Sequence, residues 1–244
     1  MTLLAVEGLS VRYGQLTALR DASLMLDEGE TLFVTGPNGA GKSTLMKAIA
    51  GVVRPAAGCI RLGGRDITGE APETIARLGF SMVPEGRQVF GELTVDENLR
   101  LGAGMRGDRA GAARDLESVF ESFPMLKERR DGAAGLLSGG QQQMLVIARA
   151  LMTRPRLVAI DEPSLGLAPL VIDQVYELLL RLRAERRLTL LVVEQSSTRA
   201  TMTGGRMMLL RSGRVVLEGD ARELNASGAV ERAYFGYSDA EEPA

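Results

Sequence analysis

The sequence predicts an α/β fold that combines a mixed core sheet, an N-terminal antiparallel β region and an inserted α-helical subdomain. Three observations lead to this prediction. Short apolar runs with β character alternate with helical patterns along most of the chain, which is typical of α/β proteins. The stretch before Glu30 holds two strand patterns and no helix. A mostly helical stretch from Val95 to Met152 interrupts the alternation.

The N-terminal half should begin with two antiparallel strands, after which strands and helices alternate. These strands are expected at 3–14 and 17–29, and a third, TLFVTG at 31–36, runs into glycines. The segment 42–50 has the pattern of a helix, which Gly51 closes because glycine readily adopts the left-handed conformation that ends helices. The next expected elements are a strand at CIRLGG, a loop through 66–68, a short helix near 73–78 and a strand at GFSMVP.

The C-terminal half returns to this alternation after the helical stretch, which is broken at GAGMRGD and DGAAG. Strands are expected at RLVAID, at LTLLVV and twice within MMLLRSGRVVLEG, with a helix from Leu170 to Arg186. We therefore expect a single domain over 1–244, with a core at 1–88 and 155–244 and a helical subdomain at about 89–154. The acidic end, SDAEEPA, is expected to fray.

Composition argues against several classes of protein. Lys and Arg number 29 against 31 for Asp and Glu, so the charge gives no hint of a nucleic-acid stripe or a basic membrane anchor and is uninformative about partners. The one cysteine, Cys59, cannot form an internal disulfide, which fits a reducing compartment and a small core residue. The start lacks a signal-peptide pattern, and no apolar run approaches the ~18–20 residues that span a bilayer. We expect a cytoplasmic protein, attached to a membrane at most through a partner, and no nucleic-acid partner.

The strongest chemical signal is GPNGAGKST, between an apolar strand and a helix. Its spacing is that of a phosphate-binding loop, in which glycines let backbone N–H groups converge and the helix N-terminus adds positive charge. Lys42 would neutralise the β and γ phosphates, while Ser43 would offer its hydroxyl to Mg²⁺ and Thr44 would donate to the α phosphate. The alternative is a glycine-rich turn that only caps a helix. The loop comprises Gly36, Pro37, Asn38, Gly39, Ala40, Gly41, Lys42, Ser43 and Thr44.

A second strand ends in the acidic pair Asp161 and Glu162, within RLVAIDEP. Asp161 can hold Mg²⁺ directly or through a water molecule, and Glu162 can orient or deprotonate an attacking water. Because many strands end in acidic turns, the pair alone is a weak signal. Together with the phosphate loop it indicates hydrolysis.

A third motif identifies the family. LSGGQQQ, from Leu137, precedes a helix and offers a hydroxyl, flexible backbone and a second helix N-terminus for phosphate. With these motifs the chain resembles the ATP-binding cassette family, whose signature is LSGGQ. The resemblance covers the chain from Tyr13 to the final helix near Tyr234-Phe235-Gly236. The resemblance implies ATP and Mg²⁺ as cofactors, and head-to-tail pairing in which one subunit's signature closes on the other's ATP. The signature residues concerned are Ser138, Gly139, Gly140 and Gln141.

The resemblance assigns three further roles. Tyr13 matches the aromatic residue that stacks on adenine, the alternative being an ordinary strand tyrosine. Ser138 and Gly140 match residues that contact the γ phosphate across the interface. The segment SLGL, at 164–167, matches the loop through which the two subunits sense each other's sites.

One departure from the family pattern lies in VPEGRQVF. Family members usually place a glutamine there, which touches Mg²⁺ and water and links the core to the helical subdomain, whereas this chain has Glu85. A carboxylate can hold the metal more firmly while it repels the γ phosphate; opposite charges ~4 Å apart interact by roughly 4 kcal/mol at an effective dielectric constant of about 20. Glu85 is thus a candidate metal ligand and catalytic residue. The alternative is a turn glutamate paired with Arg87.

The second departure is VVEQSS. Family members usually place a histidine after this strand, which grips the γ phosphate, but this chain has 0 histidines. Gln195, preceded by Glu194, falls at that position. An amide can donate two hydrogen bonds to phosphate but takes up no proton near neutral pH, so Gln195 is a catalytic candidate that positions without titrating. The alternative is that Gln195 only faces solvent in a loop and that Ser196 or Ser197 caps the next helix.

Together VPEGRQVF, SLGLAP, VVEQ and AYFG look like an ATP-binding subunit of bacterial branched-chain amino acid importers. The resemblance implies an ATPase that closes on ATP and opens after hydrolysis, moving 85–98 against a membrane partner. Its partners would be two membrane-spanning permease subunits, a related or identical ATP-binding subunit and, indirectly, a solute-binding protein. It would lie at the cytoplasmic face of the inner membrane. Importers of urea, amides or other amino acids use similar subunits.

Two other functions compete with transport. A soluble ATP-driven switch in repair or translation uses the same cassette, but such proteins usually carry two cassettes or a long coiled-coil insertion, which 244 residues do not accommodate. A small-molecule kinase has a phosphate loop but needs a site for an acceptor substrate and has no use for LSGGQ. Phosphate transfer to anything but water would favour the kinase.

Overall fold

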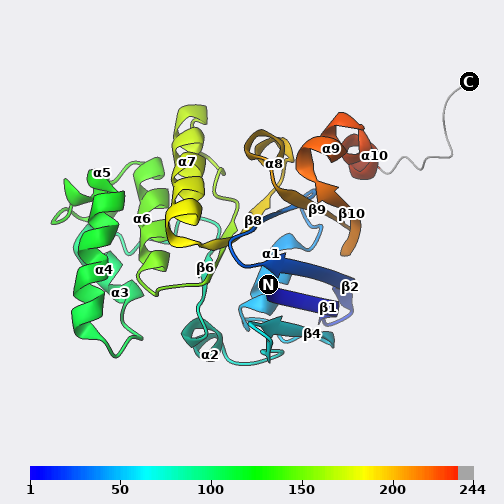
Figure 1. Ribbon diagram of the computed structural model, residues 1–244, viewed down its shortest axis with the longest axis horizontal. Coiled ribbons are helices and arrows are strands. Elements are labelled where there is room, and N and C mark those ends of the chain that lie inside the picture. The colour runs from blue at the N-terminus through cyan, green and yellow to red at the C-terminus, as the bar shows by residue number, and fades with distance from the viewer. Residues whose placement is uncertain (236–244) are drawn as a thin grey trace, which may run out of the picture. The chain divides into compact units, whose positions relative to one another are not determined.

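The computed structural model describes residues 1–235, and Figure 1 shows the order of its elements. The chain forms two compact units. The first contains Met1–Ile75 and the chain from Thr189 onward, and the second contains Ala76–Leu188. Helix α2 (Pro72–Arg77), expected near 73–78, carries the chain from the first unit into the second. Gly236 and the acidic end expected to fray lie outside the described residues.

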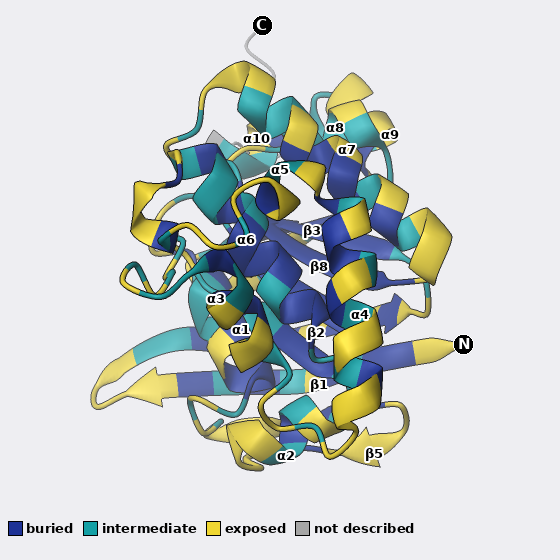
Figure 2. Cartoon of the chain, turned by 90° about the vertical axis from the view of Figure 1, so that its left-hand side faces the viewer, coloured by how far each residue is buried: buried dark blue, intermediate teal, exposed yellow. Residues whose placement is uncertain are grey.

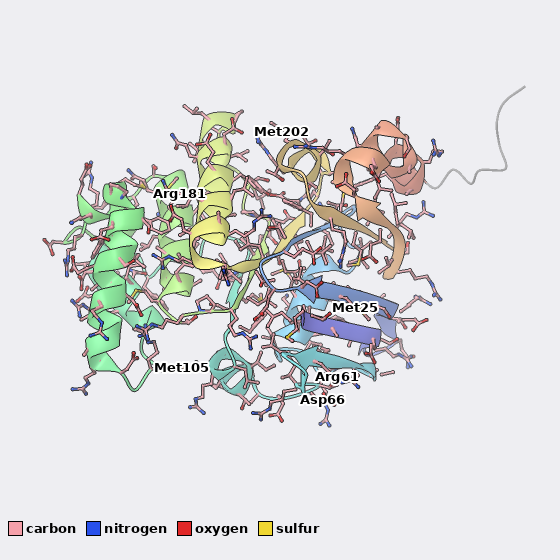
Figure 3. All side chains as sticks on the ribbon, viewed as in Figure 1. Met25, Arg61, Asp66, Met105, Arg181 and Met202 are labelled. Carbon is pink, nitrogen blue, oxygen red and sulfur yellow. The ribbon has the colours of Figure 1, made fainter. Side chains whose placement is uncertain are left out.

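The first unit contains a four-stranded antiparallel sheet in the order β2-β1-β4-β5 (Figure 1). On β2, alternate side chains from Ala22 to Leu26 are buried, as in a sheet with one covered face. Arg61 and Asp66 are cross-strand neighbours at one edge (Figure 3). Both N-terminal strand predictions are confirmed. The strands are β1 (Thr2–Tyr13), β2 (Leu16–Asp27), β4 (Ala57–Leu62) and β5 (Arg65–Asp66).

A second group of strands in the first unit has the order β10-β9-β3-β8. Strand β3 (Thr31–Thr35) runs parallel to β8 (Thr189–Glu194) and β9 (Arg206–Arg211), and every residue of β3 and β8 is buried. Strands covered on both faces need continuous apolar runs rather than alternation, which is why TLFVT and TLLVV are readable as core strands. Strand β10 (Arg214–Asp220) is antiparallel to β9, so the predicted mixed sheet is confirmed.

Two helices of the first unit were expected from the sequence and two were not. Helix α1 (Lys42–Ile49) and the final helix α10 (Ala229–Phe235) follow the sequence expectation. Helices α8 (Thr198–Thr203) and α9 (Ala221–Ala226) are too short to show an apolar period. They lie against each other, and α9 also contacts α10, so tertiary packing rather than local propensity holds them.

The second unit consists of two strands and the helical stretch. Strands β6 (Phe80–Val83) and β7 (Leu157–Asp161) are parallel, and α6 packs against β6, α3, α5 and α7. Figure 2 shows the buried and exposed faces of α4, and Arg181 of α7 (Figure 3) donates to the Ser122 carbonyl at the end of α4, at 3.0 Å. The helices are α3 (Val95–Gly102), α4 (Arg109–Ser122), α5 (Pro124–Lys127), a 3₁₀ turn (Ala134–Leu136), α6 (Gly139–Leu151) and α7 (Pro169–Arg186).

Some expectations require correction or remain open. Cys59 lies on β4 and is only half-buried, so the prediction that it is a core residue is wrong. The loop expected through 66–68 begins with a short paired strand, β5. The division into a core at 1–88 and 155–244 and a helical subdomain at 89–154 stays a prediction. In residues 1–235, no helix combines the length and apolar character that a membrane span requires.

Candidate functional site

The phosphate loop of the first unit has a shape that requires glycine at two positions. Gly36 has φ 146° and Gly41 has φ 106°, both in the region that favours glycine. A Cβ atom at Gly36 would lie 2.1 Å from the Leu210 carbonyl oxygen, and one at Gly41 would lie 2.6 Å from that of Ala18. The loop is therefore pressed against β9 and β2, and its path depends on glycine for lack of space as well as for φ.

The side chain of Lys42 occupies the middle of this loop. Its exposed fraction is 5 %, and its Nζ donates to the carbonyl oxygens of Gly36 at 2.6 Å and Pro37 at 3.1 Å. Helix α1 begins at Lys42 and has no acidic residue in its first turn, so its N-terminal amides and the ammonium present positive charge together. Ser43 and Thr44 are half-buried in the same turn. This is a site built for an anion of several charges.

Strand register places Gln195 beside the phosphate loop. In the parallel pair of β3 and β8, Thr35 is the partner of Glu194, so the next residues, Gly36 and Gln195, leave the sheet as neighbours. Glu194 is buried and Gln195 is exposed. Of the two candidate capping serines, Ser197 is the N-cap of α8 but forms no side-chain capping bond, whereas Ser196, one residue earlier, accepts from the Thr198 backbone N–H at 3.1 Å.

Tyr234, on α10, is a site residue that sequence reasoning missed. Its hydroxyl donates to the carbonyl oxygen of Gln195. Burial raises the pKa of Tyr234, and a hydrogen bond with the Gly36 backbone opposes this rise. The hydroxyl therefore meets both segments that leave the sheet. The motif AYFG contains this tyrosine, but only the fold brings it to Gln195.

Tyr13 lies at the end of the hairpin that touches the phosphate loop. It is the last residue of β1, is paired with Leu16 and has an exposed fraction of 45 %. The other strand of this hairpin carries Ala18, whose carbonyl oxygen abuts Gly41. An exposed ring at this place has a free face for stacking, as the adenine assignment requires.

The acidic pair belongs to the second unit, at the end of β7. Asp161 is the buried last residue of the strand and Glu162, half-buried, has φ 49°. A non-glycine residue in the left-handed region costs about 1–2 kcal/mol, and such strain gathers at functional positions. The Glu162 carbonyl oxygen accepts from the Leu165 N–H at 3.1 Å, which closes the turn. The sequence showed the carboxylate but not this conformation.

The signature forms the first turn of α6. Its glycines were expected to provide flexible backbone, but they lie in a regular helix at positions of close packing. Ser138 is the N-cap: its Oγ accepts from the Gln141 N–H at 3.4 Å, and Gln141 Oε1 accepts from the Ser138 N–H at 2.9 Å. Gly139 and Gly140 are helical, so flexible backbone is not their reason. A Cβ atom at Gly140 would lie 2.3 Å from Val171 Cγ1, and one at Gly139 would lie 2.5 Å from Arg87 Nη1. Both glycines permit close packing.

Glu85 lies on an exposed turn after β6, in the second unit. The alternative pairing with Arg87 is not formed, because Arg87 Nη2 donates to the Gly166 carbonyl oxygen at 2.9 Å and no ion pair joins the two within the described chain. Gln88 Nε2 donates to the backbone oxygen of Glu85 at 3.3 Å. The carboxylate of Glu85 is therefore available to a ligand.

The predicted site residues thus divide between the two units. The first holds Tyr13, the phosphate loop and Gln195, and the second holds Glu85, the acidic pair and the signature. Each group has an internal geometry suited to polyphosphate: a cationic loop in one, and carboxylates with a capped helix N-terminus in the other.

Comparisons with known proteins identify the family of this chain. Residues 19–165 match the family model described as ABC transporter. The chain is 42% identical over 234 residues to the high-affinity branched-chain amino acid transport ATP-binding protein BraG of Pseudomonas aeruginosa, covering 96% of this chain and 100% of the relative. It is 36% identical to the probable branched-chain amino acid transport ATP-binding protein LivF of Archaeoglobus fulgidus, covering 95% and 98%.

A solved structure supports the same relationship. The ADP conformation of an ATP-binding cassette of an ABC transporter superposes with a TM-score of 0.84 at 27% identity, covering 97% of this chain and 99% of that one. The family match spans more than half of the chain, and the relatives match along nearly all of it. The chain therefore belongs to the ABC transporter family and is one of its ATP-hydrolysing cassettes.

Proposed function

We propose that this chain is the ATPase subunit of a bacterial importer for branched-chain amino acids. The observation that carries the proposal is the buried Lys42, held in a loop that only glycine can form at Gly36 and Gly41. The solute is suggested by the names of the relatives BraG and LivF. Importers of urea, amides or other amino acids are the alternative. The same relatives favour transport over a repair or translation switch.

The residues of the first unit fit ATP. Gly36 and Gly41 let the loop follow its path against β9 and β2, and the Lys42 ammonium and the α1 N-terminus supply positive charge for the triphosphate. Tyr13 offers an exposed ring for adenine, and the register of β3 and β8, which brings Gln195 next to Gly36, supports donation from its amide to the γ phosphate.

Mg²⁺ prefers hard oxygen donors, and the residues proposed to bind it are Ser43 in the first unit and Asp161 and Glu85 in the second, each of which carries such an oxygen. Bound Mg²⁺ would neutralise developing charge on the phosphates. Glu162 takes the proton of the attacking water. Ser138 uses an oxygen lone pair for the α6 cap, so its hydroxyl hydrogen can be donated to the ATP of the partner subunit. One chain thus supplies parts of two sites.

The proposed assembly places this chain at the cytoplasmic face of the inner membrane, against two permease subunits. A second ATP-binding subunit, the same or a related chain, completes the pair, and a solute-binding protein delivers the solute. The segment 85–98 contacts the permease. ATP holds the pair closed, and hydrolysis releases it.

Solute uptake tests this function. Cells that lack this chain are expected to lose ATP-dependent uptake of radiolabelled leucine, and the wild-type chain, but not Lys42→Ala, should restore it. Uptake of radiolabelled urea in the same cells serves as the comparison. Normal leucine uptake with loss of urea uptake would reassign the solute, and normal uptake of both would contradict the transport function.

Replacing Glu85 with glutamine should change the metal dependence of hydrolysis. Loss of the carboxylate removes an attraction of roughly 4 kcal/mol before desolvation, for charges ~4 Å apart. ATP affinity should stay the same while the Mg²⁺ concentration for half-maximal phosphate release rises several-fold. The matched control is Glu92→Gln, an exposed carboxylate in the same segment. Superimposable Mg²⁺ titrations of wild type and Glu85→Gln would exclude Glu85 as a ligand.

Replacing Gln195 with alanine should slow hydrolysis without reshaping its pH profile. An amide aimed at developing charge can contribute on the order of 100-fold to turnover. Because an amide does not titrate, any inflection of wild-type activity between about pH 6 and pH 8 should persist in Gln195→Ala. Thermal unfolding is the control for an intact fold. An inflection that vanished with Gln195 would contradict its purely positioning role.

A further inference from the structure

We propose that Arg87 is a positioning residue that holds the signature turn of α6 and the 164–167 loop in one arrangement. This inference rests on the proposed function, because it concerns how the signature is presented to the partner's ATP. All of the residues involved belong to the second unit.

The first observation is a double contact of one guanidinium. Arg87 Nη2 donates to the Gly166 carbonyl oxygen at 2.9 Å, and the Leu165 carbonyl oxygen is 3.5 Å away. The same group lies against Gly139, where an added Cβ would be 2.5 Å from Nη1 and 2.9 Å from Cζ. The planar fork therefore touches the loop after the acidic pair and the signature at once, which a lysine ammonium cannot do.

The second observation is the backbone that presents Arg87. Arg87 and Gln88 are consecutive non-glycine residues with φ 64° and 34°. Such strain persists only where surrounding contacts impose it. Here Arg149 of α6 donates to the Gln88 carbonyl oxygen at 2.8 Å, and its guanidinium lies over the Phe90 ring at 5.1 Å.

The far end of this turn is held from α3. Asn98 is fully buried, accepts from the Phe90 N–H at 3.0 Å and donates to the Phe90 carbonyl oxygen at 3.0 Å. The turn that carries Glu85 and Arg87 is thus fixed between two helices. Any shift of α6 acts on this turn through Arg149 and through Gly139.

Electrostatics make the position of Arg87 sensitive to a bound anion. The partial positive charge at a helix N-terminus repels a nearby cation, whereas an anion bound there attracts it. Arg87 at the first turn of α6 therefore favours the state in which a phosphate oxygen sits at the signature. We infer that Arg87 aligns the signature with the loop that carries Gly166, and that a methyl group added at Gly139 would displace its guanidinium from this position.

A double-mutant cycle of Arg87→Ala and Gly139→Ala tests the inference, with phosphate release by the assembled transporter as the readout. Misplacement of a catalytic segment costs on the order of 10- to 100-fold in kcat, so each single variant should lose about that much. ATP affinity of the isolated chain should change less than about twofold, because the phosphate loop is untouched. The double variant should be no slower than the slower single variant, since both changes remove one contact.

Additive losses in the cycle, or an unchanged kcat in Arg87→Ala, would overturn the inference while leaving wild-type ATPase activity, and so the proposed function, intact. If Arg87→Ala does not fold, Arg87→Lys takes its place in the cycle. It should recover only part of kcat because it keeps the charge but loses the fork; full recovery would contradict the two-sided contact. The exposed Arg129→Ala in the same unit should match wild type.

Discussion

Glu162→Gln is expected to lower ATP turnover by about three orders of magnitude while leaving ATP affinity unchanged. A general base contributes roughly 10²- to 10⁴-fold, and an amide of the same shape accepts no proton from water. The substitution keeps the side-chain length and a residue type that tolerates the φ of 49° no worse than glutamate does. In the proposed cycle the closed pair opens only after hydrolysis, so the variant should also remain paired for longer when ATP is present.

Single-turnover phosphate release and nucleotide affinity, measured on the same preparation, check this result. Glu128→Gln is the matched control, since it removes an exposed carboxylate from the same unit. Turnover of Glu162→Gln at the wild-type rate would show that the proton goes elsewhere, and the assignment of Glu162 as the base would be wrong.

Lys42→Ala is expected to abolish detectable ATP binding at concentrations that saturate wild type. At an effective dielectric constant of about 20, one charge ~4 Å from a phosphate contributes roughly 4 kcal/mol, which is close to a thousandfold in affinity before desolvation is subtracted. The loss also leaves the Gly36 and Pro37 carbonyl oxygens without this donor. Binding of a fluorescent ATP analogue measures the effect.

Lys47→Ala provides the control for the Lys42 variant. Lys47 is exposed in the last turn of the same helix and carries the same charge. Equal thermal stability of the two variants would separate lost binding from lost fold. If Lys42→Ala bound the analogue as tightly as Lys47→Ala, the loop would not be the triphosphate site.

Sequence reasoning located the site motifs because each has a local signature. The strand, loop and helix around GPNGAGKST follow from an apolar run, glycines and a helical period, and all three are present. Gln195 was placed from the end of an apolar strand, and the register of β3 and β8 brings it beside Gly36. These are properties of neighbouring residues or of a buried parallel pair, which the sequence displays directly.

The features that sequence reasoning missed depend on contacts between distant residues. Tyr234 meets Gln195 only through the fold, and no period or motif announces that pairing. Gly139 and Gly140 look like flexible positions in the sequence, whereas Arg87 and Val171 make them packing positions. The alternative role for Glu85, an ion pair with Arg87, rested on charge alone, whereas Arg87 donates to the Gly166 carbonyl oxygen.

The left-handed backbone of Glu162 also had no sequence signal, because glutamate is an ordinary residue whose usual conformation is elsewhere. This conformation belongs to the turn that follows β7, which the hydrogen bond from the Leu165 N–H to the Glu162 carbonyl oxygen closes. Local propensity therefore could not reveal the backbone conformation of the residue that we propose as the base.

Phosphate release by the transporter that contains this chain, with its membrane subunits and solute-binding protein, tests the central claim most directly. Leucine, isoleucine or valine added with the binding protein should stimulate hydrolysis by the wild-type complex, and the Glu162→Gln complex should show neither basal nor stimulated release. Hydrolysis that ignores the solute, or that continues unchanged in the Glu162→Gln complex, would contradict the claim that this chain drives import through Glu162.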